Sequence, residues 1–409
     1  MRTPHYDFLT GGQDQGVYHN YAKYISDHGS SFVQIKEFQN IPEEVNKILS
    51  KKYIWWNKHN LPGLYINRPD HKNSLTDRIF RSESKFDGIF QFYPMHPIWM
   101  SLFSEVFGDE NSGYSLIFFS LLSIFIFYLL LSILISNQLV ISLTTFLYAI
   151  IPLNIFFSKW PVTEIQYSFF ILSSFFSTLL YLKYFQTKYI IIAVLLFLIA
   201  GFIRIDLFLF GPIIIFAYLL NNYHGSKIQK SINRALNYFG LCILISLLYG
   251  YIFTYPYFYD IMIGKKIYYF LILISSVYIS LLILKKFFNN LFNHFNKFIM
   301  NKTHTLLSLI LIISIIIGSY HLYQIGFTDH YENSFKNNWG ASNSGLKIIN
   351  NWSITKLFKY SSPFILILCF CKFLKEYSHK LSCKNIFITF IFIYFLSYFA
   401  CVHWFVGYE

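Results

Sequence analysis

Long apolar runs recur along the chain from residue 114 onward, separated by short polar connections. A helix needs about 20 apolar residues to cross a bilayer, so the shorter runs require flanking aromatic residues or local thinning of the membrane. The pattern predicts an all-α, multipass transmembrane helical bundle whose transmembrane domain covers residues 114–402. Its spans, about ten in number, are expected at residues 114–135, 139–157, 165–182, 189–203, 207–220, 238–254, 267–284, 305–322, 358–374 and 386–402.

The chain before residue 114 follows a different pattern. Apolar side chains recur at helical spacing at Val17, Tyr21 and Tyr24, with polar residues between them. An amphipathic stripe of this kind predicts a short helix that lies on the membrane surface.

A second amphipathic stripe follows Pro97, a residue that suits the first turn of a helix, and stops at Gly108. Between the two stripes, residues 29–92 mix charged, amide, proline and aromatic side chains without a clear period. We therefore expect residues 1–113 to form a large extracytoplasmic loop, with two interfacial helices around a partly structured insert.

Composition agrees with an integral membrane protein, since 55% of the residues are apolar, 21% are aromatic and only 13% are charged. The formal net charge is +13, but the Lys and Arg residues lie mostly in short segments between apolar runs. There they set membrane topology, and nucleic acid is not an expected partner. The five cysteines lie in or beside predicted spans, which argues against a disulfide framework.

Basic residues also predict the orientation of the chain, because Lys and Arg near the ends of spans resist translocation. With the first loop outside, the inner connections carry nearly all of the clustered bases, and the pair Lys265 and Lys266 is the exception. We expect a multipass protein of a cell membrane, the bacterial inner membrane, with the lipid bilayer as its first partner. The inner bases are Lys183, Lys188, Lys227, Lys230, Arg234, Lys285, Lys286, Lys297, Lys302, Lys375, Lys380 and Lys384.

Side chains that could act in catalysis or in substrate binding gather in the first loop. Asp14 lies in a glycine-containing segment, residues 11–16, four residues before Tyr18. His96 and Pro97 follow Tyr93 and Pro94 directly before the second amphipathic stripe. Two later positions carry ionisable groups at span ends, namely Glu164 in residues 158–164 and Arg204 with Asp206 in residues 203–206.

These motifs together resemble the membrane glycosyltransferases of the C superfamily (GT-C), which include the protein mannosyltransferases and the enzymes that attach aminoarabinose to lipid A. The resemblance covers roughly residues 10–220 and is distributed over several short motifs. It implies an extracytoplasmic active site that moves a sugar from a polyprenyl-phosphate carrier to an acceptor in the cell envelope. It also implies that Asp14 is catalytic, and that donor or acceptor is bound by Tyr18, His96, Glu164, Arg204 and Asp206.

The chain departs from the family pattern in two respects. Relatives usually carry a transmembrane helix before the acidic residue, but the residues before Asp14 are too few to span a bilayer. We therefore expect the natural reading frame to extend upstream and to encode one more span. Many relatives have His-Pro-Pro where this chain has His96, Pro97 and Ile98.

Each candidate residue also has a structural interpretation. Asp14 could act as general base or as the N-cap of the following helix. His96 could bind phosphate, orient the donor or ligate a divalent metal with Asp14, or it could be a surface histidine beside a rigid proline turn. A larger metal set of Asp14, His19, His96 and Glu164 matches no known ligand spacing.

The ionisable residues at the span ends also allow both a functional and a structural interpretation. Glu164 could face a cavity or stabilise a helix N-terminus through its negative charge. Arg204 could bind the donor phosphate with its planar guanidinium, or form a local ion pair with Asp206 in a tight turn.

A transporter or flippase for lipid-linked saccharides is the alternative function. Such a protein should carry ionisable residues near the middle of its spans and often has inverted repeats. Here the candidate residues all fall on one side of the predicted membrane, and this placement favours the enzyme.

Overall fold

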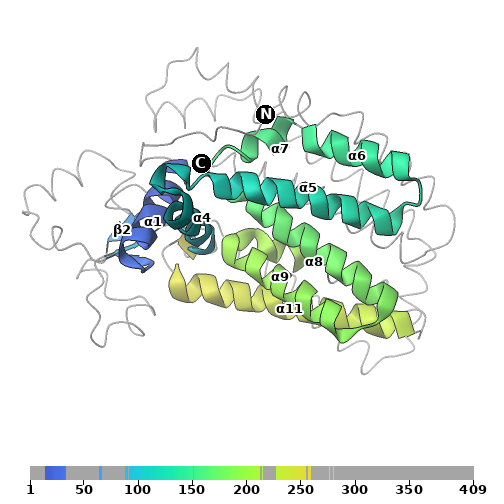
Figure 1. Cartoon of the computed structure of the whole chain (residues 1–409). Helices are drawn as coiled ribbons and strands as arrows, with labels where there is room; N and C mark the ends of the chain where they lie inside the picture. The colour runs from blue at the N-terminus through green and yellow to red at the C-terminus, as the bar shows by residue number, and fades with distance from the viewer. Residues whose placement is uncertain are drawn as a thin grey trace, which may run out of the picture. The chain divides into compact units, whose positions relative to one another are not determined.

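The computed structural model describes residues 14–33, 64–66, 88–90, 92–150, 152–211, 214, 227–254, 257, 258, 276 and 280. Most of these residues are helical (Figure 1). The first of two compact units comprises Met1–Ile150, Asn154–Phe208 and Asn237–Leu273, and it contains every contact discussed below.

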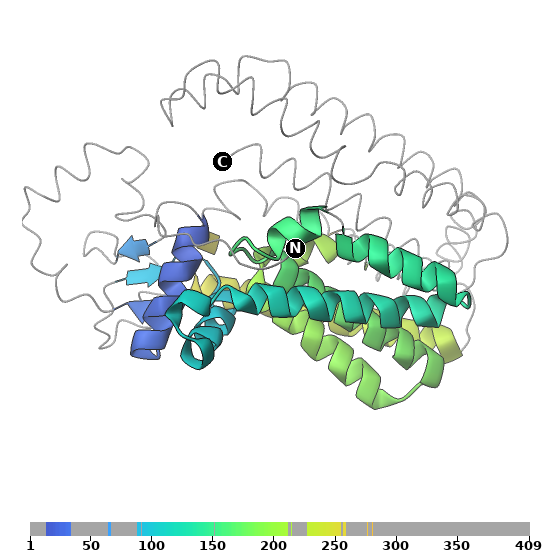
Figure 2. The same cartoon turned by 45° about the horizontal axis from the view of Figure 1, so that its top comes forward.

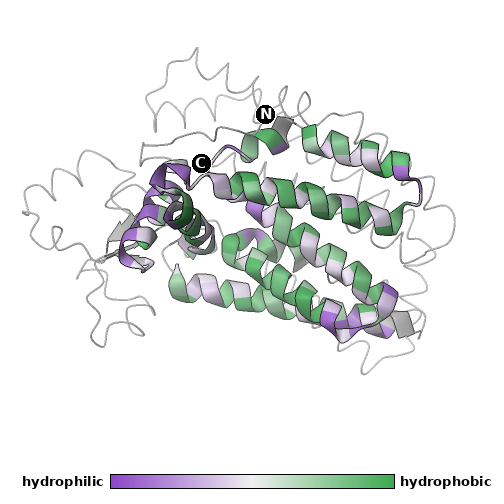
Figure 3. Ribbon diagram, in the orientation of Figure 1, coloured by the Kyte–Doolittle hydropathy of each residue, from purple (hydrophilic) through white to green (hydrophobic). Residues whose placement is uncertain are grey.

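Apolar helices form most of this unit. They are α5 (Tyr114–Leu134), α6 (Gln138–Ile150), α8 (Glu164–Tyr184), α9 (Thr187–Ile203) and the second half of α11 (Lys227–Phe253). Three helical stretches are long and apolar enough to cross a membrane, at Asp109–Leu134, Glu164–Tyr184 and Lys230–Phe253. Apolar residues make up much of α5, α8, α9 and α11 (Figure 3).

Helix α8 packs against both α5 and α9. The Ser174 hydroxyl donates a hydrogen bond to the Ala193 carbonyl at 2.8 Å and so ties α8 to α9. The Ser246 hydroxyl donates to the Gly201 carbonyl at 2.8 Å and ties α9 to α11. A methyl group added at Gly201 would lie 2.7 Å from the Ser246 side chain, so the two backbones approach closely, as small residues allow in membrane helices.

Two predicted spans differ from the structure. The run 139–157 is divided into α6 and the short helix α7 (Pro152–Phe157). Ile151 lies outside the described part, and Pro152 suits the first position of α7, where its missing N–H is not needed. The first residues of the run 207–220 belong to the 3₁₀ helix η4 (Ile205–Leu209), and residues 215–220 lie outside the described part. Nearly all residues of the spans predicted after residue 266 also lie outside the described part, as does the expected upstream helix.

The first loop contains both predicted amphipathic helices, α1 (Asp14–His28) and α4 (Met95–Phe107). The prediction that the second stripe stops at Gly108 is confirmed. Gly108 has a φ of 92°, a conformation that favours glycine, and its N–H donates to the Ser104 carbonyl at 2.8 Å. The 3₁₀ helix η3 (Asp109–Asn111) then leads into α5.

The insert between these helices contains strands that the sequence analysis did not predict. Strands β1 (Phe32–Val33), β2 (Leu64–Ile66) and β3 (Gly88–Phe90) form an antiparallel sheet in the order β1-β3-β2. Phe32 lies opposite Ile89, and Tyr65 lies opposite Ile89 on the other side. Strands of two or three residues are too short to produce a readable alternation in the sequence.

The apolar stripe of α1 is covered by protein, and the position of this helix on the membrane surface stays a prediction. Tyr21 stacks on Phe90 of β3 with ring centroids 4.1 Å apart, and the helix lies beside the sheet (Figure 2). Burial raises the pKa of the Tyr21 hydroxyl above its usual range. The rest of this buried cluster comprises Val17, Tyr18, Ala22, Phe92 and Met100.

Gly250 provides a test of the packing between α11 and the segment before α4. A methyl group there would lie 1.9 Å from the Tyr93 hydroxyl, so Gly250→Ala should destabilise the protein by about 1–3 kcal/mol through overpacking. Thermal unfolding in detergent would measure the loss. Gly240→Ala on the same helix meets nothing within 4 Å and is the matched control.

Removing the Tyr93 hydroxyl with Tyr93→Phe should restore part of the stability of Gly250→Ala. Equal unfolding temperatures for the two glycine variants would contradict this close contact.

Candidate functional site

An ion-pair network joins the beginning of α8 to the turn that follows α9. The Arg204 guanidinium contacts Glu164 at 2.6 Å through Nη1 and Asp206 at 2.5 Å through Nη2. Nη1 also donates to the Thr163 hydroxyl at 3.0 Å, and Nε donates to Asp206 at 2.8 Å. One guanidinium between two carboxylates leaves a formal charge of −1, and the three side chains are each about a quarter exposed.

Local sequence explains how these groups come together. Helix α8 begins at Glu164, so its carboxylate lies at a helix N-terminus, where the helix dipole favours negative charge. Helix α9 ends at Ile203, and Arg204 leaves it in an extended conformation. The predicted ion pair between Arg204 and Asp206 is present, and the same arginine also binds Glu164.

The second part of the site is a hydrogen-bonded pair formed by His96 and Gln166. Nδ1 of His96 lies 2.8 Å from Oε1 of Gln166, which is in the first turn of α8. His96 is 1% exposed and Gln166 is 0% exposed. The interpretation of His96 as a surface histidine is therefore wrong, although it does follow the proline turn at Pro94.

Tyr18 of α1 holds the imidazole from another side. Its ring meets the His96 ring edge-on with centroids 4.9 Å apart, and it stacks on Phe92 at 4.6 Å. Burial, together with the nearby charge of Arg204, lowers the pKa of His96 to about 4, although the hydrogen bond to Gln166 acts in the opposite direction. His96 is thus neutral at pH 7, and it would not bind a phosphate as a cation.

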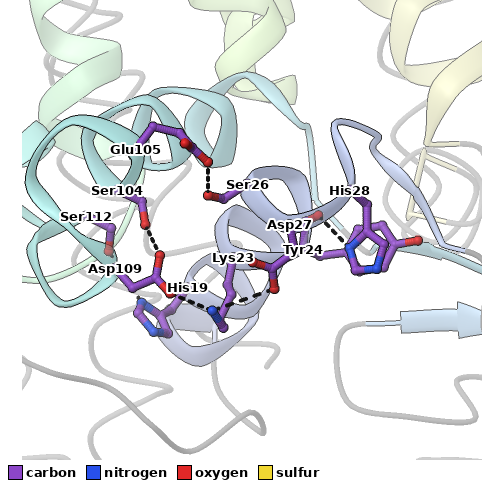
Figure 4. Close-up of polar contacts among 10 residues, drawn as sticks. All are labelled: His19, Lys23, Tyr24, Ser26, Asp27, His28, Ser104, Glu105, Asp109 and Ser112. Carbon is purple, nitrogen blue, oxygen red and sulfur yellow. Dashed lines mark hydrogen bonds and ion pairs between the residues drawn. The ribbon is translucent and has the colours of Figure 1, made fainter.

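Polar contacts on the other face of α1 fix this helix on α4 and η3 (Figure 4). Lys23 contacts Asp109 at 2.5 Å, and the Ser104 hydroxyl donates to the same carboxylate at 2.6 Å. Ser26 donates to Glu105. The hydrogen bond to Asp109 raises the pKa of Lys23, but both side chains are half exposed, so the pair adds orientation more than stability.

The structure thus brings five of the six predicted site residues into two groups. Glu164, Arg204 and Asp206 form the ion-pair network, and Tyr18 contacts His96. The first turn of α8 links the groups, because it carries both Glu164 and Gln166. Asp14 is the first residue of α1, and its side chain lies outside the described part, so its roles as base or as cap stay predictions.

Sequence reasoning missed Gln166 and Thr163. An amide two residues after Glu164, inside an otherwise apolar run, was the available signal for Gln166. Within the described residues, no group of three or more His, Cys, Asp or Glu side chains is placed to hold a metal ion. His19 instead lies with its Nδ1 3.5 Å from the Ser112 hydroxyl.

Several polar atoms of the site are buried without a hydrogen-bond partner among the described residues. They are Oε2 of Glu164, Nε2 of His96 and Nε2 of Gln166. Buried polar groups usually have partners, so each of these unpaired atoms marks a position where a ligand or water can complete the bonding. Tyr93 is buried close to this region, and burial raises its pKa, with the negative charge of Asp206 adding to the effect.

Comparisons with protein-family models, curated proteins and solved structures found no match for this chain. The resemblance to the C-superfamily glycosyltransferases therefore stays a prediction from sequence motifs.

The lowered pKa of His96 predicts a specific dependence of stability on pH. The folded state binds this proton less readily than the unfolded chain, whose histidines titrate near 6.5. Stability should be complete above about pH 6.5 and should fall by about 3 kcal/mol as the pH drops toward 4. Chemical denaturation in mixed micelles, followed by tryptophan fluorescence, would measure this fall.

His96→Gln cannot titrate and should flatten the dependence between pH 6.5 and 4. The exposed His28 is the control position, since His28→Gln should leave the profile nearly unchanged. A profile of His96→Gln that is as steep as that of the wild type would show that other groups cause the loss.

Proposed function

We propose that this chain is a multipass membrane glycosyltransferase of the C-superfamily type, which moves a sugar from a polyprenyl-phosphate donor to an acceptor of the cell envelope. The observation that carries the proposal is the polar cluster at one end of apolar helices, which is partly buried at its ion pairs and fully buried at His96. It combines a carboxylate network around Arg204 with a neutral, buried imidazole.

The chemistry of glycosyl transfer needs such a combination. As the acceptor attacks the anomeric carbon, a carboxylate must take its proton, and the phosphate must leave with the electrons of the glycosidic bond. Asp14 is our candidate for the base. It stands one helical turn before Tyr18 in α1, about 6 Å along the helix axis, and Tyr18 contacts His96.

Arg204 fits a positioning role in this scheme better than direct binding of the leaving phosphate. Its guanidinium is engaged by Glu164, Thr163 and Asp206, and the network already has a negative formal charge. A phosphate could bind there only if one carboxylate moved away. The arginine thus orients Glu164, whose second oxygen is buried and has no partner among the described residues.

Charge placement separates this proposal from a saccharide transporter. Helix α5 contains no charged residue, and those of α8 and α9 lie within two residues of a helix end. The bases of α11 are confined to its first eight residues. A substrate passage through the membrane would favour charged side chains in the middle of these helices, and the described part of the helices has none there.

The proposal requires the polar cluster to face the outside of the membrane. A cysteine placed at exposed Asn20 should react with a membrane-impermeant maleimide in intact cells, in a background without the native cysteines. A cysteine at exposed Gln186, in the turn between α8 and α9, should react only after permeabilisation. The reverse pattern would place the cluster in the cytoplasm and would exclude an extracytoplasmic enzyme.

Loss of the Asp14 carboxylate should damage transfer most. A general base typically contributes about 100- to 10,000-fold in rate, so Asp14→Asn should lower turnover by that factor while membrane insertion and yield stay normal. Asparagine caps helices about as well as aspartate, so near-normal turnover would identify Asp14 as a helix cap only. Release of sugar from undecaprenyl-phosphate sugars in proteoliposomes measures the rate.

Two further variants belong in the same assay. Glu164→Gln keeps the shape of the side chain and removes the charge that binds Arg204, so an intermediate loss is expected if Glu164 orients a substrate. Asp27→Asn on the exposed face of α1 is the control for a lost carboxylate on that helix and should keep full activity.

A further inference from the structure

The His96–Gln166 pair has one free polar atom at each end. The two side chains use Nδ1 and Oε1 for the bond between them. Nε2 of His96 and Nε2 of Gln166 are both buried and have no hydrogen-bond partner among the described residues. Leaving two such atoms unpaired would cost about 1–3 kcal/mol each, so a bound partner is expected at both.

The hydrogen bond between the side chains fixes the character of these two atoms. When Nδ1–H donates to Oε1, Nε2 of His96 is an acceptor and the Gln166 amide group is a donor. If the amide is turned around, its N–H donates to Nδ1, Nε2–H of His96 becomes a donor, and the free amide oxygen becomes an acceptor. In both arrangements the pair offers one acceptor and one donor, and neither group is charged.

A ligand that matches this pair must itself both donate and accept hydrogen bonds. A phosphate oxygen only accepts, and an ammonium group only donates. Hydroxyl groups do both, and a sugar ring carries several of them at fixed spacing. The ring of Tyr18 packed edge-on against the imidazole adds an apolar surface beside these polar atoms.

We propose that the His96–Gln166 pair binds hydroxyl groups of the sugar carried by the lipid donor, with Gln166 as the positioning residue that fixes the tautomer of His96. This inference rests on the proposed function, because it assigns the sugar-binding part of the same site. Gln166 then decides which nitrogen of His96 carries the proton, and replacing it changes both ends of the pair at once.

The test compares the binding of undecaprenyl phosphate with that of undecaprenyl-phosphate glucose, mannose and galactose to the full chain in lipid nanodiscs. The wild type should bind at least one sugar-bearing lipid more tightly than the bare lipid phosphate. Gln166→Leu should remove this preference, a loss of roughly 5- to 150-fold in affinity for the sugar-bearing lipid, while the affinity for the bare lipid phosphate stays the same.

Gln138→Leu is the matched control, because Gln138 is an exposed glutamine on α6 whose amide donates to the Tyr128 hydroxyl at 2.5 Å. It should keep the full preference for the sugar. A preference retained by Gln166→Leu, or absent from the wild type, would overturn the inference and leave the pair as a structural hydrogen bond completed by water.

Gln166→Glu keeps the size of the side chain. It should change the pH dependence of sugar preference, which a purely structural role of Gln166 would leave unchanged. A carboxylate beside Nδ1 stabilises the imidazolium, so His96 should titrate closer to neutral pH and its Nε2 should then become a donor. Sugar preference should be flat from pH 5 to 8 in the wild type, whose His96 pKa is about 4. In Gln166→Glu it should rise at the acidic end, because the Nε2–H donor and the free carboxylate oxygen then match a hydroxyl group, whereas the neutral imidazole and the carboxylate offer two acceptors. Identical pH profiles would contradict the positioning role.

Failure of this inference is distinguishable from failure of the proposed function. If the chain transfers sugar but Gln166→Leu keeps its preference, the enzyme assignment stands and the pair has no role in sugar binding. If no transfer occurs but Gln166→Leu loses the preference, the site binds lipid-linked sugar in a protein of the transporter class.

Discussion

The contact of Arg204 with two carboxylates is the interaction on which the arrangement of the site depends. It ties the first residue of α8 to the turn after α9, at the ends of helices that are otherwise almost wholly apolar. A planar guanidinium can hold two carboxylates at once, and lysine cannot reproduce this geometry. Because the first turn of α8 is fixed in this way, Gln166 lies where it reaches His96.

Burial of His96 follows from the same arrangement and decides which chemistry it can perform. The imidazole lies between Tyr18 of α1 and Gln166 of α8, and it has the charge of Arg204 nearby. A cation is disfavoured in these surroundings, so the histidine serves as a neutral hydrogen-bonding group. Helix α1 contributes to this environment through its buried stripe, while its polar face is bound to Ser104, Glu105 and Asp109.

Much of the local structure could be predicted from sequence, because helical periodicity extends over many residues. The two amphipathic helices, the stop at Gly108 and the ion pair of Arg204 with Asp206 all follow from short-range patterns. The sheet and the His96–Gln166 bond could not be predicted. Both depend on contacts between residues that are far apart in the chain, and His96 and Gln166 are 70 residues apart. A periodic pattern within a short segment cannot predict such contacts.

Whether protein or lipid covers the apolar stripe of α1 could not be predicted either, because the sequence pattern of an apolar face is the same in both cases. In α1 this face packs on Phe90 and Met100, whereas Leu102, Val106 and Phe107 of α4 remain exposed. Helix α4 therefore carries His96 on an inner face and an apolar surface on its outer face. In the glycosyltransferase that we propose, such a helix would lie at the boundary between headgroups and acyl chains. A prenyl-anchored donor would then reach His96 by lateral diffusion, so that encounter would depend on surface density in the leaflet and not on concentration in solution.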